Sequence, residues 1–155
     1  MMVPGTLALQ GGLALGGLLA GMLIARQQQR SSKILRLGIS DVSPFAHATV
    51  HGDVVYLSGV TAQADGGTIA ETDAVAEQTR RVLAVIDARL ALAGVDKTRV
   101  LQAQVWLKDI ERDFQEMNGA WNRWVGTVHK PVRATVEAKL AKPAMLVEIQ
   151  VVAAR

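Results

Sequence analysis

The C-terminal stretch KPVRATVEAKLAKPAMLVEIQVVAAR places two charges, Arg133 and Glu148, inside segments that otherwise read as apolar β-strands. An arginine in a half-buried cleft can grip a small carboxylate through its planar guanidinium fork, which a lysine cannot reproduce. A nearby glutamate can orient a water molecule or deprotonate it. The pair therefore predicts a site for a small carboxylate. The structural alternative is a salt bridge at a subunit contact, which often adds little net stability.

The twofold period of a β-strand determines which residues share a face with these charges. It places Arg133, Thr135 and Glu137 on one face of VRATVEAKL, and Glu148 and Gln150 on one face of LVEIQVVA. The alternate residues are apolar, and we expect them to pack toward helices in both strands. The polar faces are then expected to come together, either within one subunit or across an interface.

The elements that position these residues follow from changes of hydrophobic period. After an opening strand and a hairpin, a helical period begins with Thr72 as the expected N-cap and ends at Gly94. A strand follows, Asp109 caps a second helix, and two strands come after Pro131. The order β-ββ-α-β-α-ββ predicts an α+β fold in which two helices cover one face of a mixed sheet. Glutamines and Trp106 on the other face favour a subunit interface.

The first thirty residues differ in composition from the rest of the chain. Residues 7–25 are apolar except for Gln10 and have roughly the length of ~20 residues that a bilayer-spanning helix needs. Because Arg26 and Arg30 follow them, residues 1–30 are predicted to be an N-terminal membrane anchor, with residues 31–155 as a domain in the cytoplasm. The alternatives are a cleaved signal peptide and a leader added to a soluble cytoplasmic protein.

Composition excludes several classes of site. There is no cysteine, and the three histidines, His47, His51 and His129, lack helical metal-ligand spacing, so no metal site is expected. The histidines are instead expected at turns or on the surface. The net charge is +3, of which Arg26 and Arg30 supply two, leaving 15 basic and 14 acidic residues. The sequence has no Lys/Arg cluster of the kind that binds along a phosphate backbone, so no nucleic acid partner is expected.

From about Ser32 to Arg155 the sequence resembles the Rid family of reactive-intermediate deaminases, the YjgF/UK114 group. The matching stretches, in family order, are SPFAHATVHGDVVYLSGVTAQ, AEQTRRVLAVIDARLALAGVDKTRVLQAQVWLKDI, FQEMNGAW, KPVRATVEA and MLVEIQVVA. The resemblance implies a chorismate-mutase-like fold and a homotrimer with active sites between subunits. It implies hydrolysis of 2-imino acids to 2-oxo acids and ammonia, without cofactor or metal.

The resemblance also implies roles for individual residues. Arg133 in KPVRAT matches the arginine that binds the substrate carboxylate, and Glu148 in LVEIQ matches the glutamate that helps to place the water. Asn118 in EMNGAW and Ser58 in LSG match other residues of the cleft. Arg133 and Glu148 are thus the expected catalytic pair.

Two positions depart from the pattern of active members. Phe45 in SPFAHA stands where those members often carry a tyrosine, and Thr135 stands where a cysteine is frequent. Both are expected to line the substrate site. The alternative function is a catalytically silent trimer that binds small carboxylates or protein partners. Ribonuclease activity is attached to some relatives by name, but this sequence has neither a basic stripe nor a His/Lys acid–base pair for it.

Overall fold

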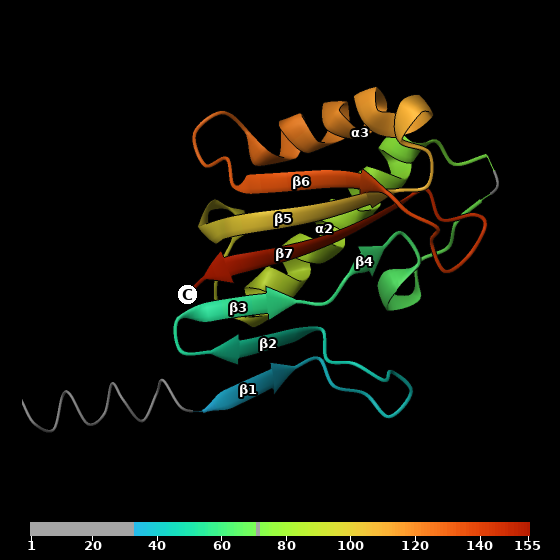
Figure 1. The fold of residues 1–155 in the computed structure, drawn as a ribbon. Coiled ribbons are helices and arrows are strands. Elements are labelled where there is room, and N and C mark those ends of the chain that lie inside the picture. The colour runs from blue at the N-terminus through green and yellow to red at the C-terminus, as the bar shows by residue number, and fades with distance from the viewer. Residues whose placement is uncertain (1–32, 71) are drawn as a thin grey trace, which may run out of the picture. The chain divides into compact units, whose positions relative to one another are not determined.

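The computed structural model describes residues 33–70 and 72–155, whose elements are labelled in Figure 1. The strands are β1 (Ile34–Leu37), β2 (Ala48–His51), β3 (Val54–Leu57), β4 (Val60–Thr61), β5 (Val100–Leu107), β6 (Val132–Glu137) and β7 (Val147–Ala154). The helices are α2 (Val75–Leu92) and α3 (Ile110–Val125), with short 3-10 turns η1 (Ala64–Gly66) and η2 (Lys97–Arg99). The predicted anchor at residues 7–25 lies outside the described residues. Within the described ranges, no helix has the length and apolarity to cross a membrane.

The seven strands of the described residues belong to one mixed sheet. Its order is β1-β2-β3-β7-β5-β6, and β4 pairs with β7 beyond β3. Strands β5 and β6 are parallel, whereas the other pairs are antiparallel. The predicted element order is confirmed, with β4 as an addition. The C-terminal strand β7 therefore lies in the middle of the sheet, while β6 forms one edge.

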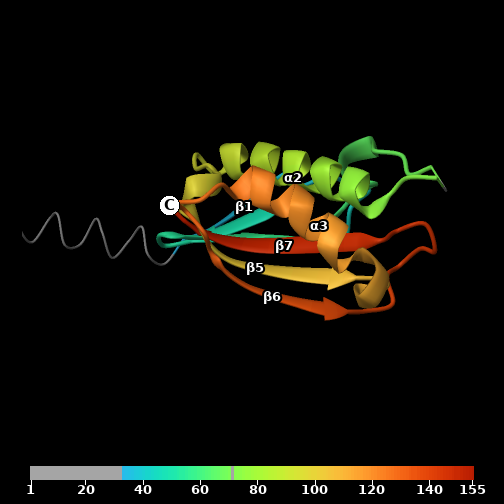
Figure 2. The same cartoon turned by 90° about the horizontal axis from the view of Figure 1, so that it is seen from above.

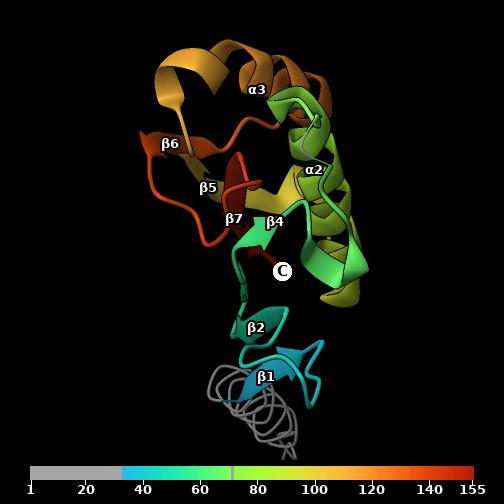
Figure 3. The ribbon, with the colours of Figure 1, turned by 90° about the vertical axis from the view of Figure 1, so that its right-hand side faces the viewer.

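Both helices cover the same face of this sheet, as Figures 2 and 3 show from two directions. The buried stripe of α2 recurs at steps of three and four residues: Val75, Thr79, Val82, Leu83, Ile86 and Leu90. It packs on strand residues such as Val105 and Ile149, which are fully buried. Burial of each large apolar side chain contributes about 1.5–3 kcal/mol. This layer is the core that the helical period predicted.

The two helices begin differently. Asp109 is the N-cap of α3, where its carboxylate accepts a hydrogen bond from the backbone N–H of Arg112 at 2.9 Å. The expectation that Thr72 caps α2 is wrong, because this helix begins at Val75 and Ala74 precedes it without a side-chain cap. The chain is extended at Ala74, so a capping residue two positions earlier cannot reach the first free N–H groups.

The orientation of β6 differs from the prediction. Arg133 and Thr135 lie beside Ala103 and Val105 of β5, which are buried toward the helices. Residues paired in register point to the same face, so Arg133 and Thr135 face the helices. The apolar alternate residues point away, and Val132 is 71% exposed. Alternation separates the two faces of a strand, but only its pairing with β5 determines which face meets α3.

The face of the sheet away from the helices is open in the described chain. It carries Gln102, Gln104 and Trp106 of β5 as predicted, beside the apolar residues Val132 and Val136 of β6. Glu148 of β7 pairs with Trp106 and points to this same open face. The mixture of amides, an aromatic ring and exposed valines has the composition of a partly wet interface.

Candidate functional site

Arg133 lies between the edge strand β6 and the helix α3. Its Nη2 donates a hydrogen bond to Oδ1 of Asn118 at 2.6 Å, and its Nη1 lies 3.9 Å from the sulfur of Met117. The guanidinium carbon lies 5.1 Å from the ring centroid of Trp121, within the range of a cation–π contact. Asn118 and Trp121 are three residues apart and so share a face of α3. The helix thus orients the guanidinium from two directions.

The charge of Arg133 has no ion-pair partner among the residues that the structure describes. Its hydrogen-bond partner is a neutral amide, and in the described ranges no acidic side chain forms an ion pair with it. Burial lowers the pKa of the guanidinium from its ordinary value, although an arginine stays protonated in proteins. Arg133 is therefore a half-buried cation with further N–H donors for an anion.

Thr135 follows Arg133 by two residues and points to the same face of β6. Its hydroxyl oxygen is buried and has no hydrogen-bond partner among the described residues. Leaving a buried polar group unsatisfied costs about 1–3 kcal/mol. The hydroxyl is suited to a ligand, a water molecule or a neighbouring subunit. The structure thus brings together Arg133, Asn118 and Thr135, which we call the arginine half-site.

Glu148 lines a hollow of about 980 Å³ to which none of Arg133, Asn118 and Thr135 contributes. Phe45, Ser58 and Glu148, all predicted site residues, line this hollow, which we call the glutamate half-site. Its other lining residues are Gly38, Ile39, Ser40, Val42, Ser43, His47, Gly59, Thr61, Gln63, Ala64, Asp65, Arg89, Ala141, Lys142 and Met145. Phe45 is 53% exposed, so its ring forms an open apolar wall.

The Glu148 carboxyl group is held against backbone. A Cβ built on Gly59 would overlap Oε1 of Glu148, so only glycine leaves room for this position of the carboxylate. Burial raises the pKa of the carboxyl group above its ordinary value. A carboxylate with a raised pKa is a better proton acceptor than an exposed one.

One chain does not bring Arg133 and Glu148 together. Strand β5 separates their strands, with Arg133 beside Ala103 and Glu148 beside Trp106. The two side chains also point to opposite faces of the sheet. Of the two alternatives that the sequence left open, a meeting within one subunit does not agree with this arrangement, whereas a meeting across an interface does. A site using both groups has to combine the arginine half-site of one copy with the glutamate half-site of another.

Three residues of the glutamate half-site were not anticipated: His47, Asp65 and Arg89. Nε2 of His47 lies 3.3 Å from Oδ1 of Asp65, and Nη2 of Arg89 donates to the same oxygen at 2.8 Å. The sequence context predicts His47 at a turn or on the surface, and the residue does lie at a bend directly before β2. The sequence does contain a signal for Arg89. It is a charged residue next to Leu90, at the edge of the apolar face of α2.

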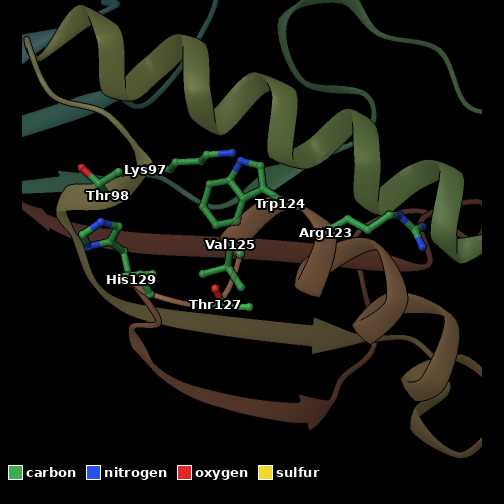
Figure 4. A pocket seen from close by; sticks show the side chains of 9 residues that line it. Lys97, Thr98, Arg123, Trp124, Val125, Thr127 and His129 are labelled. Carbon is green, nitrogen blue, oxygen red and sulfur yellow. The ribbon is translucent and has the colours of Figure 1, made fainter.

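A smaller hollow of about 280 Å³ lies at the end of α3 and contains none of the predicted site residues. Figure 4 shows Lys97, Trp124 and His129 on its walls. Nζ of Lys97 lies 5.9 Å from the centroid of the Trp124 ring. The Trp124 ring lies 5.2 Å from that of Trp121, and its Nε1 donates to Asp87 at 3.0 Å. These contacts support Trp121, on which the Arg133 guanidinium rests.

Comparison with known proteins places these residues in a family context. A family model described as Endoribonuclease L-PSP matches residues 38–155. A RutC family protein from Haemophilus influenzae is 41% identical over 108 residues, covering 70% of this chain and 88% of that protein. A solved YjgF family structure from Neisseria meningitidis has a TM-score of 0.71 at 38% identity, covering 81% of this chain and 97% of its own. A YjgF/YER057c/UK114 family member from Mycobacterium tuberculosis has a TM-score of 0.66 at 27% identity, covering 79% and 100%.

Proposed function

The chain belongs to the Rid (YjgF/UK114) family, whose family model is described as Endoribonuclease L-PSP, and from this premise we propose that it hydrolyses reactive 2-imino acids to 2-oxo acids and ammonia. The observation that carries the proposal is the Arg133 guanidinium. It is half-buried, oriented by Asn118 and Trp121, and without an acidic partner in the described part of the chain. Such a cation suits the carboxylate of a small acid, which it can bind through two N–H groups.

In the proposed reaction, Arg133 binds the substrate carboxylate and the Thr135 hydroxyl donates to it. Glu148 accepts a proton from a water molecule as the water oxygen bonds to the iminium carbon, whose π electrons move to nitrogen. The nitrogen of the resulting carbinolamine takes up a proton and the C–N bond breaks. Ammonia leaves with the bonding electrons, and the hydroxyl group loses its proton to become the 2-oxo group.

This chemistry needs few groups because an iminium carbon is already electrophilic. Holding the carboxylate and one water molecule in reacting geometry is the main requirement, and a fixed geometry can be worth several orders of magnitude in rate. The reaction as proposed uses no cofactor. Phe45 has no hydroxyl group, so its role is limited to apolar contact with the substrate side chain.

We further propose that the chain acts as a homotrimer, with each site formed between two copies. The separation of Arg133 and Glu148 on opposite faces of the sheet supports this assembly, because neither half-site has both groups. The open face with Trp106, Val132 and Val136 supplies apolar area for a contact between copies. A closed ring of three uses one such contact three times.

The direct test generates 2-iminobutanoate in the cuvette from threonine with a dehydratase and follows ammonia release. The purified protein is expected to accelerate hydrolysis beyond the spontaneous rate. A rate equal to the spontaneous one, measured over several imino acids, would refute the enzymatic proposal. It would favour the alternative, a trimer that binds small carboxylates without turnover.

Moving the Glu148 carboxylate is expected to damage catalysis without unfolding the protein. In Gly59→Ala the new methyl group displaces Oε1 of Glu148, while the backbone at residue 59 is not left-handed and accepts alanine. Since a positioned base contributes about 10²–10⁴-fold, kcat is expected to fall by about 10²-fold. Gly119→Ala is the control, because its Cβ would meet only Nη1 of Arg123, at 3.8 Å. Wild-type kcat in Gly59→Ala would contradict the role of Glu148.

The pH profile should report the same carboxylate. Burial raises the pKa of Glu148, so its proton-accepting form is lost at a higher pH than that of an ordinary carboxyl group. After subtraction of spontaneous hydrolysis, kcat/KM is expected to fall as the pH falls through this raised pKa. The Glu148→Gln variant should lack this acid limb, and a limb that persists in it would assign the titration to another group.

A further inference from the structure

The side chain of Arg89 is buried on helix α2, although arginine is seldom buried unless it is paired. Only 3% of the residue is exposed, and its side chain points to the wall of the glutamate half-site. Its Nη2 and Nε donate to the two carboxylate oxygens of Asp65, at 2.8 and 3.4 Å. Its other arm, Nη1, donates to the hydroxyl oxygen of Ser58 at 2.8 Å. Burying this charge is costly, so these directed contacts call for a reason beyond packing.

Asp65 is held in an unfavourable conformation at the same wall. Its φ angle is 54°, in the left-handed region, and among the described residues it is the one non-glycine residue with a positive φ. Its side chain is 35% exposed, and the hydrogen bond from Arg89 lowers the pKa of its carboxyl group. Nε2 of His47 lies 3.3 Å from the same carboxylate. A strained residue and a buried charge thus occur in one cluster.

The contact with Arg89 determines what the Ser58 hydroxyl can do. A guanidinium has donors only, so it occupies a lone pair of the serine oxygen and leaves the serine proton free to be donated. The Ser58 hydroxyl donates to the carbonyl oxygen of His47 at 3.5 Å, a hydrogen bond so long that a ligand oxygen can replace it. Because Ser58 lines the glutamate half-site beside Glu148, the proton is available to a ligand in that hollow.

We infer that Arg89, held by Asp65, is a positioning residue that turns the Ser58 hydroxyl into a hydrogen-bond donor for an oxygen atom of the bound ligand. The inference rests on the proposed function, since it assumes that the glutamate half-site receives a 2-imino acid and releases a 2-oxo acid. It adds a role for two residues that touch no substrate themselves. Arg89 acts on the ligand through Ser58, and Asp65 acts through Arg89.

A double-mutant cycle tests this chain of contacts. Binding of 2-oxobutanoate is measured by calorimetry, and kcat and KM are measured separately, for the wild type, Ser58→Ala, Arg89→Met and the double variant. Each single substitution is expected to raise Kd by about 3–10-fold, the loss of one hydrogen bond. The double variant should bind no more weakly than Ser58→Ala alone, because Arg89 has nothing left to orient.

Control variants separate this role from a structural one. Arg81→Met removes another paired arginine of α2, bonded to Asp73 and Glu77 away from the hollow, and should leave Kd unchanged. If Arg89→Met fails to fold in thermal unfolding, Asp65→Asn replaces it in the same cycle, because this side chain is partly exposed. Its effect should likewise vanish in the Ser58→Ala background.

Three results would overturn the inference, and the third differs from the others because it also overturns the proposed function. In a protein that hydrolyses imines, the increases in Kd caused by Ser58→Ala and by Arg89→Met or Asp65→Asn could prove to multiply in the double variant. That result would overturn this inference and leave the proposed function standing. It would mean that Arg89 contacts the ligand directly or acts by packing. The same holds if Ser58→Ala has no effect. A wild type that neither binds 2-oxobutanoate nor accelerates hydrolysis would overturn the proposed function, and this inference with it.

Discussion

Replacement of Arg133 by alanine is expected to lower kcat/KM for 2-iminobutanoate by about 10²–10⁴-fold. The substitution removes two charge-assisted hydrogen bonds to the substrate carboxylate, each contributing about 1.5–3 kcal/mol. A loss of about 1.4 kcal/mol corresponds to a factor of ten. The measurement is the ammonia-release assay, with the imine generated in place. The kcat/KM of Arg133→Lys should lie between those of the wild type and Arg133→Ala, because an ammonium group keeps the charge but lacks the planar arrangement of N–H donors.

The matched control for this prediction is Arg80→Ala, which removes an exposed arginine of α2 paired with Glu77. An exposed pair of this kind contributes about 0–1 kcal/mol, so activity and folding should both be retained. Circular dichroism of Arg133→Ala should show an unchanged fold. The guanidinium is only half-buried at the edge of the sheet, where it contacts Asn118 and Trp121 of α3. Unchanged kcat/KM in a folded Arg133→Ala protein would refute the assignment of Arg133 as the carboxylate ligand.

The second large effect is the recovery of activity from two inactive proteins. Arg133→Ala damages the arginine half-site and Glu148→Gln damages the glutamate half-site. If each site combines half-sites from two copies, mixed trimers contain some sites in which both halves are intact. In a random 1:1 mixture with a cyclic contact, about one quarter of the sites should be complete. Refolding the two variants together is therefore expected to restore about one quarter of wild-type kcat per chain.

A mixture of Arg133→Ala with Asn118→Ala provides the control. Both substitutions lie in the arginine half-site, which comes from one chain, so no mixture of the two can restore an intact half. Recovery in the first mixture and none in the second would establish the shared site. Absence of recovery in the first, with mixed trimers demonstrated by two affinity tags, would contradict a site between copies.

The largest part of the fold was predictable because it depends on local periods. A stripe at steps of three and four residues marks α2, and the alternation in RVLQAQVWLKD marks β5. Of the two predicted N-caps, one was right and one was wrong. Asp109 sits directly before its helix and caps it, whereas Thr72 is separated from α2 by extended backbone.

The identity of the candidate site residues was also available from the sequence. A charge inside an otherwise apolar strand, as at Arg133 and Glu148, conflicts with simple packing, and such conflicts concentrate at functional positions. Arg89 presented the same conflict on a helix, but one charged residue beside a buried stripe does not reveal its partners. Asp65 and Ser58 lie 24 and 31 residues away along the chain.

The sequence alone determined the order of the elements, the family and the polar residues available for chemistry, because all three follow from residue types at short spacing. Only the tertiary structure decided where those residues point. The twofold period of a strand is the same viewed from either face, so it cannot say which face meets the helices. Pairing of β6 beside β5, a long-range contact, turns Arg133 toward α3, while β7 turns Glu148 toward the open face. Of the two arrangements that the sequence left open, one subunit or an interface, this divergence favours the interface.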